Sequence, residues 1–145
     1  MSAAAPTTAA VPDALHSDYW SAVDARTAQL TAYRCTQCDT HFLPRVMTCT
    51  ACGATEFERA ALSPHGTLYT YTIIHNAGGV WPAVYAVGYV DFPEGVRVFG
   101  QLRETEASAL SIGARVGVEP TVLYTRKDGT PVTCFRFHVV NEGAR

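Results

Sequence analysis

The spacing of hydrophobic and polar positions changes along the chain and separates it into segments. In DALHSDYWSAVDARTAQL, residues 13–30, apolar side chains recur near helical spacing and Asp13 is placed to cap the amino end, which predicts a short N-terminal helix. From residue 66 onward β-branched and aromatic residues alternate, as in GTLYTYTIIH, which predicts a strand. Residues 1–12, MSAAAPTTAAVP, are small and interrupted by proline, and we expect a disordered tail there.

Four more strands are expected after the first. AVYAVGYVDF and VRVFGQL are separated by Pro-Glu-Gly and should pair as a hairpin. ARVGVEPTVLYT and PVTCFRFHVV flank Asp128 and Gly129, a favoured hairpin turn, and should form a second hairpin. The polar segment ETEASALSIGAR between them should hold one or two helical turns. This order suits a five-stranded Greek-key barrel of the OB type over residues 61–145, with a fragment of a β-sandwich as the alternative.

The stretch CTQCDTHFLPRVMTCTAC, residues 35–52, carries four of the five cysteines as two C-x2-C pairs. Two such turns facing each other give a tetrahedral site of four thiolates at Cys35, Cys38, Cys49 and Cys52. We expect one structural Zn2+ there, because four thiolates leave no open position for a reacting water. Iron in a rubredoxin-like electron carrier is the alternative. Arg34, Arg45 and His41 either offset the charge of the site or are ordinary solvated side chains.

Composition narrows the classes of partner. Hydrophobic residues make up 48% and charged residues 17% of the 145 residues, which is typical of a folded domain. A net charge of -2 gives no electrostatic reason to expect nucleic acid. No apolar run approaches the roughly 18 to 20 residues that span a bilayer, so we expect a cytoplasmic protein that does not enter membranes. In that compartment thiols stay reduced, which favours metal over disulfides.

The chain resembles a known family in the order of its motifs. The ribbon YRCTQCDTHFLPRVMTCTACG, the strand GTLYTYTIIH, the pair AVYAVGYVDFPEGVRVFGQL, then LSIGARVGVEPTVLY and CFRFHVV are similar to acyl-CoA-associated proteins built from a rubredoxin-like zinc ribbon and a C-terminal OB fold. The resemblance implies a mainly β fold with the ribbon at residues 31–60. Asp39 departs from the glycine common after the first cysteine pair.

The same resemblance implies a noncatalytic accessory role. Its members are similar to small subunits that stabilise a thiolase-fold catalytic subunit and help to shape its acyl-CoA entrance, in thiolysis, retro-aldol cleavage or acyl transfer. The sequence agrees in having no nucleophile with an evident base and no Gly-rich phosphate motif. Activity of the chain alone is therefore not expected.

Further residues are candidates for contact with CoA or a partner. Arg45, Arg97, Arg103 and Arg115 could receive the CoA phosphates, or could simply aid solubility. His75 and Trp81 flank or lie in the loop NAGGVWP, which either contacts the partner or folds onto its own core.

Cys134 shares strand parity with Arg136 and His138. It is therefore either an activated thiolate or a small buried hydrophobe, and the second is the usual state of a lone cysteine in a strand.

Single-stranded nucleic-acid binding remains a second class of function. OB folds and zinc ribbons both bind such ligands on aromatic platforms, and Tyr69, Tyr71, Tyr85 and Tyr89 could supply the stacking. The charge of the chain argues against this class.

Overall fold

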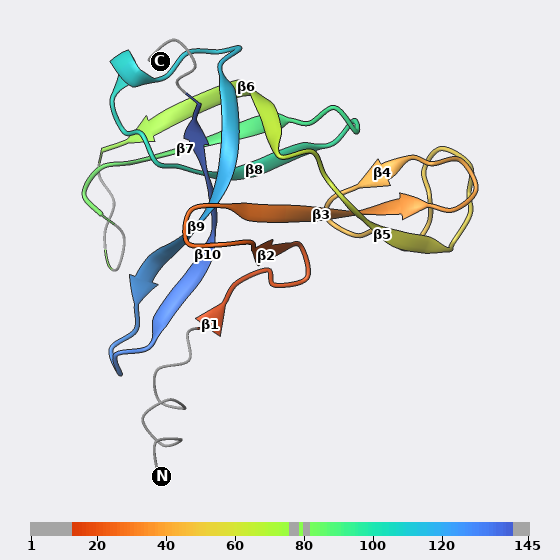
Figure 1. Ribbon diagram of the computed structural model, residues 1–145, viewed down its shortest axis with the longest axis horizontal. Helices are drawn as coiled ribbons and strands as arrows, with labels where there is room; N and C mark the ends of the chain where they lie inside the picture. Colours follow the sequence, from red (N-terminus) through yellow and green to blue (C-terminus); the bar gives the residue numbers. More distant parts are fainter. Residues whose placement is uncertain (1–12, 76–78, 80–81, 141–145) are drawn as a thin grey trace.

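The computed structural model describes residues 13–75, 79 and 82–140, and the regular secondary structure of this part of the chain is β-strand apart from one 3-10 turn (Figure 1). The strands form a six-stranded and a four-stranded sheet. Their bounds are β1 (Asp13–Ala14), β2 (Trp20–Ala22), β3 (Ala28–Cys35), β4 (His41–Phe42), β5 (Phe57–Ala61), β6 (His65–Ile74), β7 (Tyr85–Asp91), β8 (Arg97–Leu102), β9 (Arg115–Thr125) and β10 (Pro131–Val139). One 3-10 turn, Ala107–Ala109, lies between β8 and β9, where helical turns were expected.

Strands β6 to β10 close into a five-stranded barrel of the OB type. The antiparallel pairs β6–β7 and β7–β8 form a meander, and β9–β10 form the second hairpin, so both predicted hairpins are confirmed. β6 also pairs with β9, and β8 pairs with β10 in parallel at Leu102 and Phe137, which closes the sheet. A closed sheet leaves no reason to keep the sandwich alternative.

The predicted N-terminal helix is wrong. In the described part of residues 13–30 the chain forms β1, which pairs in parallel with β10, and β2, which pairs with β3. Asp13 lies in β1 instead of capping a helix, and His16 has a φ of 55°, outside the right-handed helical region. Pairing with β10 and β3 overrides a weak helical spacing of four apolar residues, of which Val23 is exposed.

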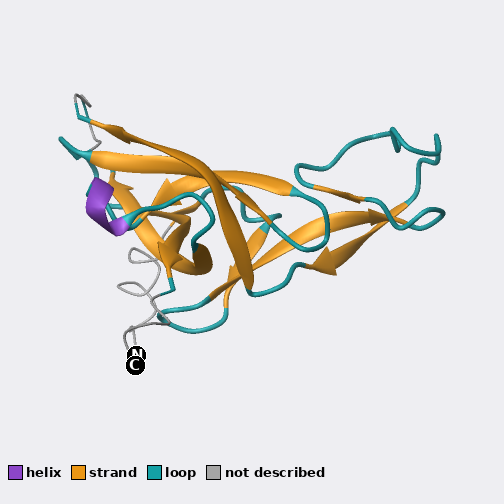
Figure 2. Cartoon of the chain, turned by 90° about the horizontal axis from the view of Figure 1, so that it is seen from above, coloured by secondary structure: helices purple, strands orange, loops and turns teal. Residues whose placement is uncertain are grey.

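The ribbon and the barrel share one hydrophobic core. Trp20, Leu30 and Leu62 belong to the same buried cluster as Leu68 and Phe137 of the barrel. The carboxylate of Glu94, in the β7–β8 turn, accepts hydrogen bonds from the backbone N–H and the hydroxyl of Ser63 at 3.1 and 2.7 Å. Seen from above, the far part of the ribbon extends away from the barrel (Figure 2).

Two glycines allow close packing in the barrel. A Cβ at Gly100 would lie 2.6 Å from the ring of Phe137, and one at Gly88 would lie 2.6 Å from the carbonyl oxygen of Thr70. Glycine in a strand interior commonly marks such a close approach of another part of the chain. Among the described residues there is no helix with the length and apolar character needed to cross a membrane.

Candidate metal centre and barrel surface

The two cysteine pairs form turns of the same geometry. The N–H of Asp39 donates to the carbonyl of Cys35, and the N–H of Gly53 donates to the carbonyl of Cys49, at 3.0 and 2.8 Å. Each donor is the fourth residue after the first cysteine of its pair and has a positive φ, 67° at Asp39 and 82° at Gly53. Aspartate is among the few residues other than glycine that adopt this conformation readily, so the departure from glycine at position 39 preserves the turn.

In each turn the backbone N–H of the first cysteine also donates a hydrogen bond. The N–H of Cys35 donates to the carbonyl of Thr40 and that of Cys49 to the carbonyl of Ala54, at 2.9 and 2.8 Å. The N–H of Gln37 lies 3.4 Å from the sulfur of Cys35, as expected for an amide that stabilises a thiolate ligand. Backbone hydrogen bonds therefore fix the conformation of both turns, and the sulfur atoms of the two turns converge on one site.

The four sulfur atoms fit a tetrahedral metal ion. They all lie within 4.8 Å of one another, with 3.5 Å between Cys35 and Cys52 and 3.6 Å between Cys38 and Cys49. A tetrahedron with zinc–sulfur bonds of about 2.3 Å has sulfur–sulfur edges of roughly 3.8 Å. All four cysteines are unpaired thiols, so no disulfide competes for them. Cys35, Cys38, Cys49 and Cys52 would hold a structural zinc that fixes the ribbon, with no position left for a substrate.

Arg34 and Arg45, two of the charged residues near the cysteines in sequence, have local partners of their own. Arg34 is paired with Asp39 and with Glu58. Arg45 lies over the ring of Tyr33, 5.4 Å from its centroid. The plain interpretation, surface side chains with local partners, fits Arg34 and Arg45 better than compensation of the thiolate charge.

The four arginines proposed to meet CoA do not form one cluster. Arg115, Thr67, Asp91 and Arg97 are successive cross-strand neighbours on β9, β6, β7 and β8, which places the two arginines roughly 14 Å apart. Arg103 lies elsewhere, bonded to Glu119 and Glu104. Arg45 belongs to the ribbon.

Arg97 and Arg115 have different surroundings. The guanidinium of Arg97 donates to both carboxylate oxygens of Asp91, at 2.6 and 3.1 Å, and its central carbon lies 3.5 Å from the centroid of the Tyr69 ring. Arg115 lies 3.0 Å from Nδ1 of His65. These contacts hold each side chain in one orientation.

The loop candidates are only partly visible. His75 is exposed and follows directly after β6. Trp81 lies outside the described residues, so its role stays a prediction.

Cys134 has the surroundings of a buried hydrophobe. Burial raises the pKa of its thiol, which is opposite to the effect that activates a cysteine. Arg136, on the same strand, donates to Glu119 at 2.6 Å. The structure thus favours the inert interpretation of Cys134.

Two features of the barrel surface were missed from the sequence. Glu119 is a carboxylate with 7% exposure that accepts hydrogen bonds from Arg103 and Arg136. The sequence signal for this buried carboxylate was its position among apolar residues in the strand ARVGVEPTVLYT. Tyr69, Tyr89 and Phe99 are exposed, and the rings of Tyr89 and Phe99 pack edge to face at 5.2 Å. Only Phe99 had not been singled out from the sequence as an aromatic surface residue.

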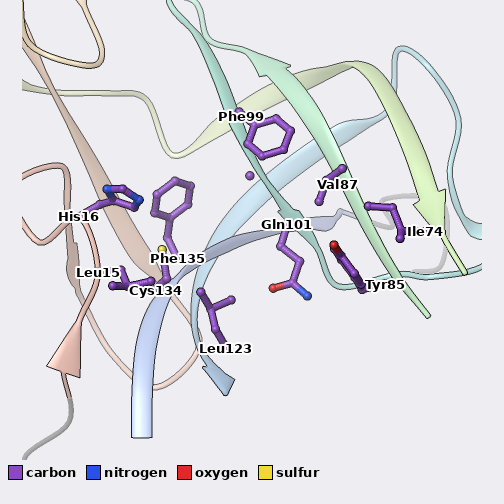
Figure 3. A pocket seen from close by; sticks show the side chains of 11 residues that line it. Leu15, His16, Ile74, Tyr85, Val87, Phe99, Gln101, Leu123, Cys134 and Phe135 are labelled. Carbon is purple, nitrogen blue, oxygen red and sulfur yellow. The ribbon is translucent and has the colours of Figure 1, made fainter. Parts of the chain in front are cut away.

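A cavity of about 360 Å3 opens beside this aromatic surface (Figure 3). Leu15, Cys134 and Leu123 lie on one side of it, and Ile74, Tyr85 and Val87 on the other, with Gln101 between them. It is the kind of concave, mostly apolar space in which proteins bind small molecules.

Comparison with known proteins agrees with both halves of this architecture. Residues 24–58 match the family model described as ChsH2, rubredoxin-like zinc ribbon domain, and residues 60–119 match ChsH2, C-terminal OB-fold domain. The chain belongs to the ChsH2 family of zinc-ribbon and OB-fold proteins. The expected family is confirmed, and with it the assignment of the four-cysteine centre to structural zinc.

Named relatives of this ChsH2-family chain include subunits and scaffold proteins. It is 35% identical over 130 residues to the benzoylsuccinyl-CoA thiolase subunit BbsA of Thauera aromatica, covering 86% of this chain and 87% of BbsA. It is 33% identical over 90 residues to a DUF35 domain-containing scaffold protein of Methanocaldococcus jannaschii, covering 60% and 64% of the two chains. The solved Ltp2-ChsH2(DUF35) aldolase matches with a TM-score of 0.62 and 23% identity over 74% of this chain and 84% of that chain, a likeness of fold.

Proposed function

We propose that this chain is a noncatalytic, zinc-binding accessory subunit of a thiolase-fold enzyme that acts on CoA thioesters. The observation that carries the proposal is its similarity, over most of both chains, to BbsA, a subunit of a benzoylsuccinyl-CoA thiolase. In this role the zinc fixes the ribbon and the barrel supplies the docking surface. The partner performs thiolysis, retro-aldol cleavage or acyl transfer.

The chemistry of the described residues agrees with a noncatalytic role. The metal centre is closed by four thiolates, so it offers neither a Lewis acid nor a bound hydroxide to a substrate. The remaining cysteine is buried with a raised pKa. Glu119, a buried carboxylate of the described chain, is neutralised by two arginines. These groups stabilise a surface, and the reacting groups belong to the partner.

We further propose that the subunit contributes to the acyl-CoA entrance. Arg97 and Arg115 lie on one row of the barrel surface, roughly 14 Å apart, so each would contact a different phosphate of CoA, and Arg97 would first have to exchange its pairing with Asp91. Arg45, Arg103, His75 and Trp81 remain candidates for contact with CoA or the partner. Five cysteines without a disulfide, four of them metal ligands, favour a cytoplasmic location for the complex.

The test is purification of a tagged copy from its native host, with mass spectrometry of copurifying proteins and metal analysis of the same sample. The expected result is a stoichiometric thiolase-fold protein and one zinc per chain. A sample that arrives alone and contains iron, with the absorption of an iron–thiolate centre, would contradict the proposal in favour of an electron carrier.

Single-stranded nucleic-acid binding is retained as the competing function because of one observation. Tyr69, Tyr89 and Phe99 are exposed together on the barrel, as in proteins that stack bases on an OB fold. The net charge of -2 opposes it, because backbone affinity depends on cationic side chains. Copurification of RNA or DNA in place of a thiolase-fold protein would decide for this function.

A further inference from the structure

The two cysteine turns expose one sulfur atom each. The first cysteine of each pair is buried, with 0% exposure at Cys35 and 2% at Cys49, whereas the second cysteine, Cys38 or Cys52, is exposed. The turns lie on either side of β4, in the part of the ribbon that extends from the barrel (Figure 1). A small reagent in solution therefore meets Cys38 and Cys52 before the two buried ligands.

The exposed sulfur of the first turn has a hydrogen-bond donor that the second turn lacks. The hydroxyl of Thr40, two residues after Cys38, lies 3.1 Å from its sulfur. A cysteine that ligates zinc is a thiolate, so the hydroxyl is the donor of this bond. Ala54 holds the equivalent position after Cys52 and has a methyl group without a hydroxyl. A hydrogen bond to a thiolate withdraws electron density from the sulfur, so Cys52 is the more nucleophilic of the two exposed ligands.

The surface beside Cys52 is also the more open of the two. Gly53 follows Cys52 directly, and a Cβ placed on it would meet no atom within 4 Å. The equivalent residue of the first turn is Asp39, whose side chain pairs with Arg34. Hydrogen peroxide is small and uncharged, so its reaction with a thiolate needs an accessible, electron-rich sulfur and no binding pocket. Cys52 offers such a sulfur.

A second sulfur lies close enough to complete an oxidation that begins at Cys52. The sulfur of Cys35 is 3.5 Å from that of Cys52. Cysteines that sense oxidants typically combine an accessible thiolate with a neighbouring cysteine that resolves the oxidised form. Cys52 and Cys35 have this arrangement across the metal centre, one exposed and the other buried.

We propose that Cys52 is a peroxide-sensitive site whose oxidation opens the zinc centre reversibly. The thiolate of Cys52 attacks one oxygen of hydrogen peroxide, the O–O bond breaks, and a sulfenic acid and a hydroxide ion form. The thiolate of Cys35 then attacks the sulfenic sulfur, which forms the Cys35–Cys52 disulfide and releases a second hydroxide. The two sulfur atoms lose two electrons, and the peroxide gains them.

The zinc leaves because only Cys38 and Cys49 remain as thiolate ligands, whereas a structural site uses four. A dithiol reductant and fresh zinc should restore the centre, since a disulfide is reversible. This site depends on the ribbon alone and would exist whether or not the chain is an accessory subunit.

The experiment is stepwise addition of hydrogen peroxide to the purified, zinc-loaded full chain. A chromogenic chelator measures released zinc, and mass spectrometry maps disulfides and the sulfenic acid trapped by dimedone at short times. One equivalent of peroxide should release one zinc, give the Cys35–Cys52 disulfide and label Cys52 ahead of Cys38. Earlier labelling of Cys38, or a first disulfide other than Cys35–Cys52, would overturn the inference.

Position 54 tests the role of the missing hydroxyl. Ala54→Thr gives the second turn the donor that Thr40 supplies to the first, and should slow zinc release by roughly three- to tenfold. Ala54→Val is the matched control, because valine has the shape of threonine without the hydroxyl, and it should release zinc at the wild-type rate. Equal slowing in both variants would show that bulk, and not the hydrogen bond, protects the sulfur, which contradicts the inference.

Position 40 gives an independent test if the variants at position 54 fail to fold or to bind zinc. Thr40→Ala removes the hydrogen bond to Cys38 and should add a dimedone label at Cys38 to the one at Cys52. Thr40→Ser keeps the hydroxyl and should leave Cys52 as the first labelled residue. An unchanged labelling pattern in Thr40→Ala would contradict the inference.

The outcomes separate this site from the proposed function. In a copurified complex, peroxide should release the partner together with the zinc. If the free chain responds as expected but no thiolase-fold partner copurifies, the peroxide site stands and the accessory role falls. If the complex forms but peroxide leaves zinc in place in both the complex and the free chain, the accessory role stands and the peroxide site falls.

Discussion

At the scale of single residues, backbone conformation decides which substitutions the metal centre accepts. Asp39 and Gly53 occupy equivalent positions after the two cysteine pairs, both with positive φ. A glycine after the second cysteine pair is a sequence signal for this conformation, whereas the same conformation at Asp39 became visible only in the structure. A sequence pattern signals positive φ through glycine, whereas aspartate occurs in many other conformations.

Gly53→Ala should lower the free energy of unfolding by about 1 kcal/mol, because the added Cβ meets no atom within 4 Å and the cost is that of the left-handed backbone alone. Asp39→Gly is the matched variant, which relaxes the backbone but loses the pairing with Arg34 and should change stability by less than about 0.5 kcal/mol. Urea unfolding of the zinc-loaded proteins measures both. A larger loss in Asp39→Gly than in Gly53→Ala would show that the ion pair, not the backbone, controls the turn.

Cys134 should react with thiol reagents far more slowly than an exposed cysteine at pH 8, because burial raises its pKa and lowers its thiolate fraction. The rate should keep rising above pH 9 and should jump when urea unfolds the chain. Mass spectrometry of zinc-loaded protein after alkylation identifies the site, and Cys134→Ala is the control. Rapid modification at pH 7 would revive the activated-thiolate interpretation.

At the scale of elements, strands were predictable where alternation and turn residues agreed. The hairpin around Asp128 and Gly129 illustrates this, since Gly129 has a φ of 91° and the register follows on both sides. The N-terminal segment shows the opposite case. Its strands are short. β1 is stabilised by pairing with β10, which is distant in sequence, and β2 by pairing with β3, which packs into the core. A local periodicity does not reveal such pairing.

Glu119→Ala should destabilise the barrel by about 2 kcal/mol. Its carboxylate joins Arg103, just after β8, to Arg136 on β10, so the substitution removes charged hydrogen bonds at the closure of the barrel. Asp91→Ala is the control, because it breaks a bidentate but exposed pair with Arg97 and should cost less than about 1 kcal/mol. Equal losses in urea unfolding would mean that burial of Glu119 adds nothing.

For the whole molecule, the order of ribbon and barrel and the four metal ligands were readable from the sequence, because cysteine spacing and turn chemistry are local signals. The cavity was not, because its walls come from β6, β7, β8, β9, β10 and the segment after β1, and their meeting depends on the closure of the whole barrel. The boundary predicted between residues 60 and 61 stays a prediction. The barrel and the inner part of the ribbon share one hydrophobic core. We therefore expect the outer part of the ribbon to depend on the metal for its folding more than the barrel does.

Metal removal tests that inequality. The first half of β3 contributes Leu30 and Ala32 to the common core, whereas the turns around Cys38 and Cys52 lie on either side of β4, in the part of the ribbon that extends from the barrel (Figure 1). A strong chelator, or Cys38→Ser or Cys52→Ser, should therefore unfold residues 35–57 and leave β6 to β10 folded, because hydrophobic burial, not zinc, stabilises the barrel. Amide hydrogen exchange should show protection lost in the ribbon and kept in Leu68, Val90 and Phe137, and the partner should no longer copurify. Simultaneous loss of protection in ribbon and barrel would show that the two unfold as one cooperative unit. If the chelated chain instead kept full protection and still bound the partner, the ribbon would not need its metal.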